Sequence, residues 1–514
     1  MSNECPRVYV PARFATHAHR WLIALLIVSS AVHALELTAD MTTTEPVIAP
    51  LTTRHSVRIG TQDVRYSATF AETLLTDAQG KPQATISSTA YLRATSAARA
   101  DRPVLFAFNG GPGASSSPLH FGSLGPRRWV DGGGPRRIIE NEHSLLDVTD
   151  LVFIDPVGTG FSRLRKDGNA AEYWNIAGDA RAALTLIRSW LREHDRMQSP
   201  VFIAGESYGG FRLATFADEL TELRVAGMLL ISPLLDASAS AGAPGNDLPY
   251  IFELPTLAAG AWYHNSIDRA GRTLEQHYET VAHFAQSDYA LALQQGNTLS
   301  AERRKQVAAR MAALIGLPAA VISAANLRID SEQFLQTLLA DRKLLVGRLD
   351  MRITAPQPTA PPKDASRPPA ADDPALGLRG ANVIKSEPIK TYFARELGVH
   401  TARDYLSLSL DVNFRWNWQG SVWPPEFYVN PTANIAKLLQ RQPQTRVLLL
   451  GGYYDLATPL LAPRYAIAHA GIPPEQVTIA AFAAGHSPFE GEDNLPRFNA
   501  VVREFVLAST TQLR

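Results

Sequence analysis

A serine flanked by glycines is the most conspicuous reactive residue of this chain. Gly205-Glu-Ser207-Tyr-Gly209 fits the pattern Gly-x-Ser-x-Gly, with the apolar run Val201–Ile203 before it and a helix-like segment, 211–223, after it. A tight turn from strand to helix needs a glycine two residues before and two residues after the serine. The turn exposes the hydroxyl at the positive end of the helix. The pattern predicts that Ser207 is a nucleophile above a sheet.

A serine hydroxyl needs a general base, and that base needs a carboxylate to orient it. On sheets of this kind the acid and then the histidine follow the serine along the chain. Asp455 follows an apolar run and two glycines in the segment 446–455, and His486 ends the segment 477–486. We therefore predict the catalytic triad Ser207, Asp455 and His486. An ordinary turn aspartate and a capping or surface histidine are the alternatives.

Catalysis by a serine also needs hydrogen-bond donors for the oxyanion that develops on the substrate. Asn109-Gly-Gly-Pro-Gly113 leaves the apolar run Val104–Phe108 and is rich in glycine, which lets backbone N–H groups approach a ligand closely. We predict that the N–H groups of Gly111 and Tyr208 form the oxyanion hole. A phosphate-cradling loop or a plain turn is the alternative, but no Gly-Lys-Ser/Thr follows the glycines.

These residues need a sheet to position them, and the chain contains the expected strands. Short apolar runs are typical of strands buried on both faces; they occupy Val104–Phe108, Leu151–Ile154, Val201–Ile203, Met228–Ile231 and Val447–Leu450. Between the second and third runs, residues 176–194 have apolar positions at helical spacing. This alternation predicts an α/β protein with a mostly parallel central sheet flanked by helices.

Two other regions differ from this pattern. Residues 54–94 alternate polar and apolar types around a turn at Asp77–Gly80, which predicts an antiparallel hairpin. Residues 236–385 lose the strand–helix alternation; 273–314 is helical in character, and Thr354–Pro374 is dense in proline. We expect a core in two parts, 50–235 and 386–514, a helical cap insertion at 236–385, and a final helix near Leu495–Leu507.

The N-terminus has the features of a signal peptide, which we assign to residues 1–34. Arg7, Arg13 and Arg20 precede the apolar run 21–28, and Val32-His-Ala34 carries small residues at the positions before a cleavage site. The expected location is the periplasm or the outside of the cell. An uncleaved membrane anchor is the alternative, but the run is shorter than the ~20 residues of a spanning helix, so we expect no stable membrane insertion.

Composition excludes several other classes. The chain has 514 residues, of which 46% are hydrophobic, so it can bury a large core. Its 49 basic and 49 acidic residues balance, so no basic surplus favours binding to nucleic acid. The only cysteine is Cys5, within the signal segment, which excludes a cysteine nucleophile and a thiolate metal site in the mature protein. Nothing in the sequence indicates a metal or an organic cofactor.

Four segments, taken in order, resemble the serine carboxypeptidase family. They are Asn109–Ser116, Asp155–Ser162, Gly205–Gly209, and the loops of Asp455 and His486. The resemblance covers the core from about residue 55 to the end and fades in the insertion, which in the family is a variable cap over the active site. It implies an α/β-hydrolase fold and a peptide substrate that loses C-terminal residues through an acyl-enzyme.

The resemblance also implies roles for single residues. Ser207, Asp455 and His486 match the triad, and Gly111 and Tyr208 match the oxyanion donors. Asn109 and Glu206 match residues that hydrogen-bond the terminal carboxylate of the substrate, a role for which Glu206 would have to be protonated.

Three positions depart from the family pattern. Ala107 replaces a tryptophan, Ser123 replaces a second glutamate, and Ala114 replaces a cysteine. Since Ser123 removes the partner carboxyl, we expect an optimum near neutral pH, with the ionisation of His486 setting the lower limit. Arg127, Arg128 or Arg212 is a further candidate for holding the substrate carboxylate, with a solvated surface position as the alternative.

A carboxypeptidase is the leading functional prediction. An esterase or acyltransferase with the same machinery is the first alternative, and a non-catalytic binding protein on the same fold is the second. Trp416, Trp418 and Trp423 either line a substrate pocket or serve only in packing.

Overall fold

A computed structural model describes residues 39–95, 99–130, 136–239, 244–358, 369–378, 380–418 and 429–513. The expected signal segment and Trp423 lie outside these ranges. Across the same ranges, no helix combines the length and the apolar character needed to cross a membrane.

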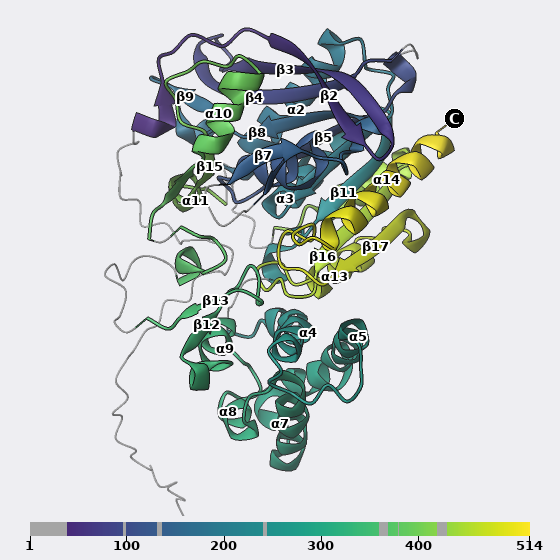
Figure 1. Cartoon of the computed structure of the whole chain (residues 1–514). Helices are drawn as coiled ribbons and strands as arrows, with labels where there is room; N and C mark the ends of the chain where they lie inside the picture. Colours follow the sequence, from purple (N-terminus) through teal and green to yellow (C-terminus); the bar gives the residue numbers. More distant parts are fainter. Residues whose placement is uncertain are drawn as a thin grey trace, which may run out of the picture.

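The molecule is built on one large central sheet (Figure 1). Six strands form its parallel part, in the spatial order β8, β5, β10, β11, β16, β17. Their bounds are β5 Val104–Phe108, β8 Asp150–Asp155, β10 Val201–Glu206, β11 Val225–Ile231, β16 Arg446–Gly452 and β17 Val477–Phe482. The mostly parallel central sheet of an α/β protein, which the alternating runs predicted, is thus confirmed.

The expected antiparallel hairpin extends one side of this sheet. Strands β2 (Leu51–Ile59), β3 (Gln62–Thr76) and β4 (Pro82–Arg93) pair in sequence, and β4 pairs antiparallel with β8. The short strands β1 (Thr42–Thr43) and β9 (Arg163–Arg165) complete that side.

The two faces of the sheet bury separate cores because successive side chains of each strand point to opposite faces. In β5, Phe106 and Phe108 pack on the face that carries α2, α3, α12 and α13, whereas Leu105 and Ala107 pack on the face of α10 and α14. The bounds are α2 Ile176–Glu193, α3 Tyr208–Phe216, α10 Glu387–Glu396, α12 Thr432–Arg441, α13 Leu461–His469 and α14 Asn494–Gln512.

A mainly helical body lies beside this sheet, in the lower half of Figure 1. It consists of α4 (Leu248–Tyr263), α5 (Leu274–Phe284), α6 (Ala290–Gln295), α7 (Ala301–Ile315), α8 (Ala319–Ala324) and α9 (Ser331–Thr337). Its apolar side chains, such as Phe252 and Met311, belong to the same buried cluster as Phe106 of the sheet. The helical body is therefore packed continuously with one face of the core.

Among the described residues, the remaining strands form three two-stranded sheets, and two further short α-helices are present. The sheets are β6 (Arg127–Val130) with β7 (Arg137–Glu140), β12 (Leu344–Val346) with β13 (Thr354–Pro356), and β14 (Val383–Lys385) with β15 (Leu406–Ser409). The helices are α1 (Ser117–Leu119) and α11 (Leu410–Phe414).

Some boundaries differ from the sequence prediction. The helix after Ser207 ends at Phe216 instead of near residue 223, because a 3₁₀ turn, Ala217–Glu219, follows it. The proline-dense segment begins with a strand, β13, since Ala355 pairs with Leu345; residues 359–368 of that segment lie outside the described ranges.

Candidate active site

Ser207 occupies a strained turn between β10 and α3. Its backbone has φ 61° and ψ −127°, in the left-handed half of conformational space that residues other than glycine avoid. Its carbonyl accepts hydrogen bonds from the N–H groups of Gly210 (2.9 Å) and Leu234 (3.1 Å). A Cβ at Gly205 would lie 2.3 Å from the carbonyl oxygen of Gly209, so the turn admits no side chain there. The sequence thus forces the serine into this geometry.

Asp455 and His486 meet on loops that follow β16 and β17. The Nδ1 atom of His486 lies 2.9 Å from Oδ2 of Asp455, which is fully buried. Thr458 donates to both carboxylate oxygens of Asp455, from its hydroxyl (2.6 Å) and its N–H (3.1 Å), and the N–H of Ala457 donates as well (2.9 Å). The carboxylate is therefore fixed from several sides and can orient the imidazole ring.

The charges of this pair stabilise each other. Burial acts to raise the pKa of Asp455, but His486 and the hydrogen bonds of Thr458 outweigh it, and the pKa lies below its usual value. Burial acts to lower the pKa of His486, but Asp455 outweighs it, and the pKa is raised. The pair therefore favours an imidazolium, the form that a general base reaches after taking a proton.

Ser207 and His486 both line one cavity of about 590 Å³. Its walls come from segments distant in sequence, including β7, β14, α10, β15 and α11. Apolar side chains form much of the lining: Pro118, Trp129, Ile138, Leu376, Ile384, Ile389, Leu408 and Leu410. The serine and the histidine that the sequence predicts as nucleophile and base thus line a space large enough for a small organic ligand.

The loop after β5 packs directly on the first turn of α3. A Cβ at Gly110 would lie 2.4 Å from the backbone nitrogen of Tyr208. Gly111 has φ 98° and is followed by a cis peptide bond to Pro112, and the carbonyl of Gly110 accepts from the N–H of Ala114 (3.0 Å). The structure thus brings Gly111 and Tyr208, the expected oxyanion donors, into neighbouring segments beside Ser207.

Glu206 is a buried carboxyl whose two oxygens each accept a hydrogen bond. Asn109 donates from Nδ2 to Oε2 (2.6 Å), and Ser487 donates from its hydroxyl to Oε1 (2.8 Å). Burial raises the pKa of Glu206 to about 7, against the opposing effects of His486, Ser487 and Asn109. The group therefore titrates near neutral pH within the cavity of Ser207.

Among the cavity residues that sequence reasoning missed, Ser487 and Glu490 lie close to His486 in the chain. Both line the cavity, and burial raises the pKa of Glu490. They lie one and four residues after His486, and that proximity in sequence was the only signal that could have indicated them.

Two of the three departures from the family pattern lie away from the cavity lining, whereas the third, Ala114, lines the cavity. Ser123 is fully buried and donates to the carbonyl of Leu119 (3.4 Å), and Ala107 is enclosed in the core on the far face of the sheet. Neither of them is among the residues that surround the cavity.

The arginine hypothesis is wrong for Arg212. Its side chain is only 1% exposed and pairs with Asp179, so it is neither a ligand in the cavity nor a surface residue. Arg127 pairs with Glu140 and Glu396, both at 3.1 Å. Arg127, Arg128 and Arg212 are all absent from the cavity lining, which contains the cations Arg136, Arg348 and Lys385 instead.

Trp416 and Trp418 serve in packing. Their rings contact the ring of Tyr208 edge-on, with centroids 5.2 and 5.6 Å away, and neither residue lines the cavity.

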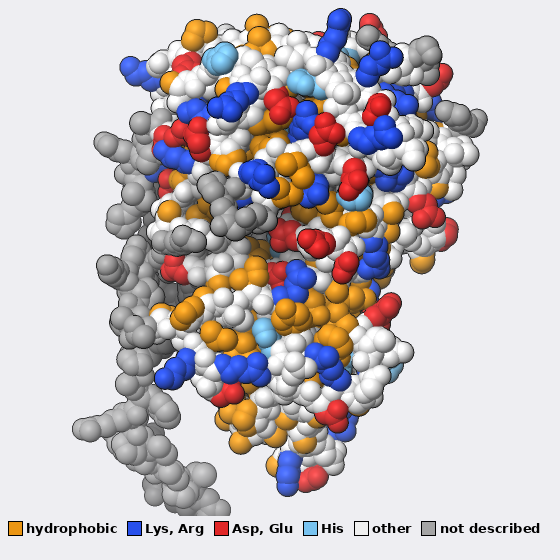
Figure 2. Space-filling view, in the orientation of Figure 1, with side chains coloured by type: hydrophobic (Ala, Val, Ile, Leu, Met, Phe, Trp, Pro, Cys, Tyr) orange, Lys and Arg blue, Asp and Glu red, His pale blue; other side chains and the backbone are white. Residues whose placement is uncertain are grey.

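Basic and acidic side chains are interspersed on the face of the molecule drawn in Figure 2. In the part of the chain that the structure describes, no group of three or more His, Cys, Asp or Glu side chains is arranged to hold a metal ion.

Comparison with known proteins agrees with this geometry. Residues 90–298 match the family model described as serine carboxypeptidase. Serine carboxypeptidase-like 33 from Arabidopsis thaliana is 33% identical over 136 residues, which are 26% of this chain and 27% of that protein. Carboxypeptidase Y homolog A from Neurospora crassa is 37% identical over 120 residues, 23% of this chain and 20% of that protein. The aligned part thus spans about a quarter or less of these relatives.

A solved structure resembles nearly the whole chain. Kex1Δp, a prohormone-processing carboxypeptidase from Saccharomyces cerevisiae, superposes with a TM-score of 0.50 at 14% identity, over 86% of this chain and 91% of that one. The mostly parallel central sheet and the strand-to-helix turn at Ser207 together define an α/β hydrolase. Within that class, residues 90–298 are similar to the serine carboxypeptidase family.

Proposed function

We propose that the protein is a serine carboxypeptidase that removes C-terminal residues from peptides, with Ser207, His486 and Asp455 as its catalytic triad. The observation that carries this proposal is the shared cavity. It contains a serine on a strained turn, a histidine held by a buried aspartate, and a buried carboxyl that titrates near neutral pH.

The first step is the attack of Ser207 on the scissile carbonyl carbon. His486 takes the hydroxyl proton, and Asp455 stabilises the imidazolium that results. The N–H groups of Gly111 and Tyr208 donate to the oxyanion of the tetrahedral intermediate. His486 then gives the proton to the leaving amine, and an acyl-enzyme on Ser207 remains.

The second step releases the shortened peptide. His486 takes a proton from a water molecule, the resulting hydroxide attacks the acyl carbon, and the same donors hold the second oxyanion. The proton returns to Ser207 when the ester bond breaks.

Recognition of the free C-terminus falls to Asn109 and Glu206. A neutral Glu206 donates its proton to the substrate carboxylate, and its raised pKa keeps a large neutral fraction up to about pH 7. Asn109 holds the carboxyl in place through its bond to Oε2.

The test is residue release from a blocked peptide offered as the free acid and as the C-terminal amide, followed by mass spectrometry. We expect release from the free acid to be at least about tenfold faster, since only this form has the carboxylate that Glu206 recognises. Ser207→Ala is the blank. Equal rates for both forms would contradict the assignment of Asn109 and Glu206.

An esterase is the second candidate because Ser123 provides no second carboxyl at the position where the family has one. Hydrolysis of a simple aryl ester without release from either peptide would favour it.

We also infer that the protein is exported to the periplasm or the outside of the cell. Residues 7–34 support this location because basic residues are followed by an apolar run and then by small residues, the order found in a signal peptide. Secretion of a fusion reporter by residues 1–40, and its loss when a charge is placed in the apolar run, would test it.

A further inference from the structure

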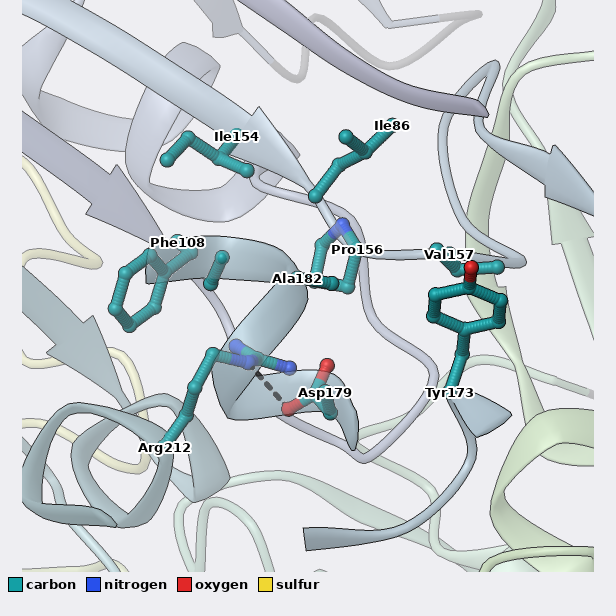
Figure 3. Close-up of a pocket in the computed structure, with 10 residues that line it drawn as sticks. Ile86, Phe108, Ile154, Pro156, Val157, Tyr173, Asp179, Ala182 and Arg212 are labelled. Carbon is teal, nitrogen blue, oxygen red and sulfur yellow. Dashed lines mark hydrogen bonds and ion pairs between the residues drawn. The ribbon is translucent and has the colours of Figure 1, made fainter. Parts of the chain in front are cut away.

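A buried ion pair joins α2 to α3 (Figure 3). Nε of Arg212 lies 2.6 Å from Oδ2 of Asp179, and the two side chains are 1% and 6% exposed. Asp179 belongs to the first turn of α2, and Arg212 lies one turn after Tyr208 in α3. Apolar residues surround the pair, including Phe108, Ile154 and Val157. Burying two charges is costly unless their hydrogen bonds are satisfied, so the pair needs an explanation.

A second nitrogen of the Arg212 guanidinium reaches the loop that carries Gly111. Its Nη1 donates to the backbone carbonyl of Asn109 over 2.7 Å. The carbonyl of Asn109 and the N–H of Gly110 belong to one planar trans peptide, so they point in opposite directions. A fixed carbonyl therefore fixes the orientation of the peptide unit at which the loop leaves β5.

Arg212 also contacts the other segment that supplies an expected donor. Its guanidinium lies 5.3 Å from the ring centroid of Tyr208 and 5.1 Å from that of Phe108. A Cβ at Gly110 would lie 2.4 Å from the nitrogen of Tyr208, so the two segments are already in close contact. One buried side chain thus touches both segments, and Asp179 fixes its orientation.

We propose that the Asp179–Arg212 pair is a positioning device for the oxyanion hole. Asp179 holds the guanidinium, and the guanidinium holds the carbonyl of Asn109 and the ring of Tyr208, so that the N–H groups of Gly111 and Tyr208 converge on one point. Neither residue touches the substrate. This inference rests on the proposed serine-hydrolase function.

The test is Arg212→Lys, because lysine keeps the charge beside Asp179 but lacks the planar fork that bonds two acceptors at once. The substrate is a blocked amino-acid aryl ester, which has no terminal carboxylate and therefore isolates the oxyanion step. We expect kcat to fall about tenfold to a hundredfold with KM changed less than about twofold, since loss of a whole oxyanion donor costs about 10²–10³ in kcat.

The matched control is Arg196→Lys. Arg196 forms an equally buried pair with Asp150 (2.8 Å, 2% and 3% exposed) and donates to the carbonyl of Arg102 (2.6 Å). Asp150 pairs with Val104 at the amino end of β5, the end opposite to the loop of Asn109. We expect a similar loss of thermal stability in both variants, with kcat lowered only in Arg212→Lys.

A second measurement distinguishes a displacement of the oxyanion donors from a general loss of protein stability. A peptide aldehyde forms a tetrahedral adduct whose oxygen occupies the oxyanion hole, so its Ki should rise in parallel with the fall in kcat. Ki of a non-covalent product should stay within about twofold. If Arg212→Lys does not fold, Asp179→Asn is compared with Asp150→Asn in the same way.

Three outcomes are distinct. A folded Arg212→Lys protein with wild-type kcat and aldehyde Ki overturns the inference. Equal kinetic losses in Arg212→Lys and Arg196→Lys overturn it too, since the effect is then one of stability. Wild-type protein that hydrolyses neither ester nor peptide refutes the proposed function, on which the inference depends.

Discussion

Glu206 is a carboxyl of the cavity whose charge changes near neutral pH. Its neutral form can donate to a substrate carboxylate, whereas the anion repels it, and its pKa is about 7. His486 must be neutral to accept a proton, and its pKa is raised above the usual 6.5. Glu206 raises the pKa of His486, and His486 lowers the pKa of Glu206, so the two groups titrate as a coupled pair.

This coupling predicts a bell-shaped dependence of kcat/KM on pH for a peptide free acid, with a maximum near neutral. The lower limb reflects protonation of His486 and the upper limb ionisation of Glu206. An aryl ester should show only the lower limb. Glu206→Gln should remove the upper limb, because glutamine stays neutral, whereas the exposed Glu475→Gln should leave the profile intact. An upper limb that persists in Glu206→Gln would contradict the role of Glu206.

Asp455→Asn should lower kcat by about 10³–10⁴ and change KM little. An amide in place of the carboxylate favours the wrong tautomer of His486 and no longer stabilises the imidazolium. Steady-state kinetics on the aryl ester measure the effect, and circular dichroism checks the fold. A variant that keeps more than a tenth of the wild-type kcat would exclude Asp455 from the triad.

Residue types and their spacing were enough to predict candidates on loops, but not the contacts between those loops. Ser207 was indicated by its glycines, and Asp455 and His486 by the strands before them. The bond from Ser487 to Glu206 joins residues 281 positions apart, so it depends on how two loops pack. Arg212 was misinterpreted because nothing in a sequence reveals that an arginine is enclosed beside an aspartate of another helix.

Among the elements, the loop between β5 and α1 depends on its contact with α3. Gly110→Ala should displace this loop, because a Cβ would lie 2.4 Å from the nitrogen of Tyr208. Overpacking of this kind costs about 1–3 kcal/mol, and we expect kcat to fall at least about tenfold. Thermal melting and ester kinetics measure the two effects.

Gly80→Ala is the control for that variant. Gly80 has φ 80° with open space around its Cα, so alanine strains an exposed turn far from the cavity. It should lower Tm without changing kcat. An unchanged kcat in Gly110→Ala would show that the contact does not position the loop.

Strands were the elements that the sequence predicted best. The apolar run Val104–Phe108 coincides with β5, because a strand buried on both faces has no polar position to interrupt it. Helix ends were harder to predict. Helix α3 stops at Phe216 although apolar residues continue to Leu223, since the chain there turns and packs against α12.

At the scale of the whole molecule, a buried carboxyl lies where the helical body packs against the sheet, and its charge depends on pH. Glu253 of α4 is buried, and burial raises its pKa to about 8 against the opposing effect of Arg348, which lines the cavity. A carboxyl whose pKa is raised by folding contributes stability at pH values below its pKa in the unfolded chain, which is about 4.5. That contribution is lost as the pH rises through the folded pKa of about 8.

Glu253→Gln should therefore make the protein more stable than wild type at pH 9 and change its stability little at pH 4. Chemical unfolding at the two pH values measures the difference, with the exposed Glu302→Gln as control. A wild-type protein whose stability does not fall between pH 5 and pH 9 relative to Glu253→Gln would show that Glu253 is not buried as a neutral acid.

Composition predicted a division of the chain into a core and an insertion, but it did not predict how these parts pack together. Loss of the strand–helix alternation after residue 236 predicted an insertion, and α4–α9 fall within it. Phe252 and Met311 of the insertion pack in the same cluster as Phe106 of the sheet. No sequence pattern shows which apolar face of a helix meets which face of a sheet.

The most direct test of the central claim is covalent labelling of the purified protein with a fluorophosphonate, with the modified residue located by tandem mass spectrometry. We expect one label, on Ser207, formed at least about a hundredfold more slowly in His486→Ala and blocked by a peptide aldehyde. A folded protein that stays unlabelled, or that carries the label on another serine, would contradict the assignment of Ser207 as an activated nucleophile.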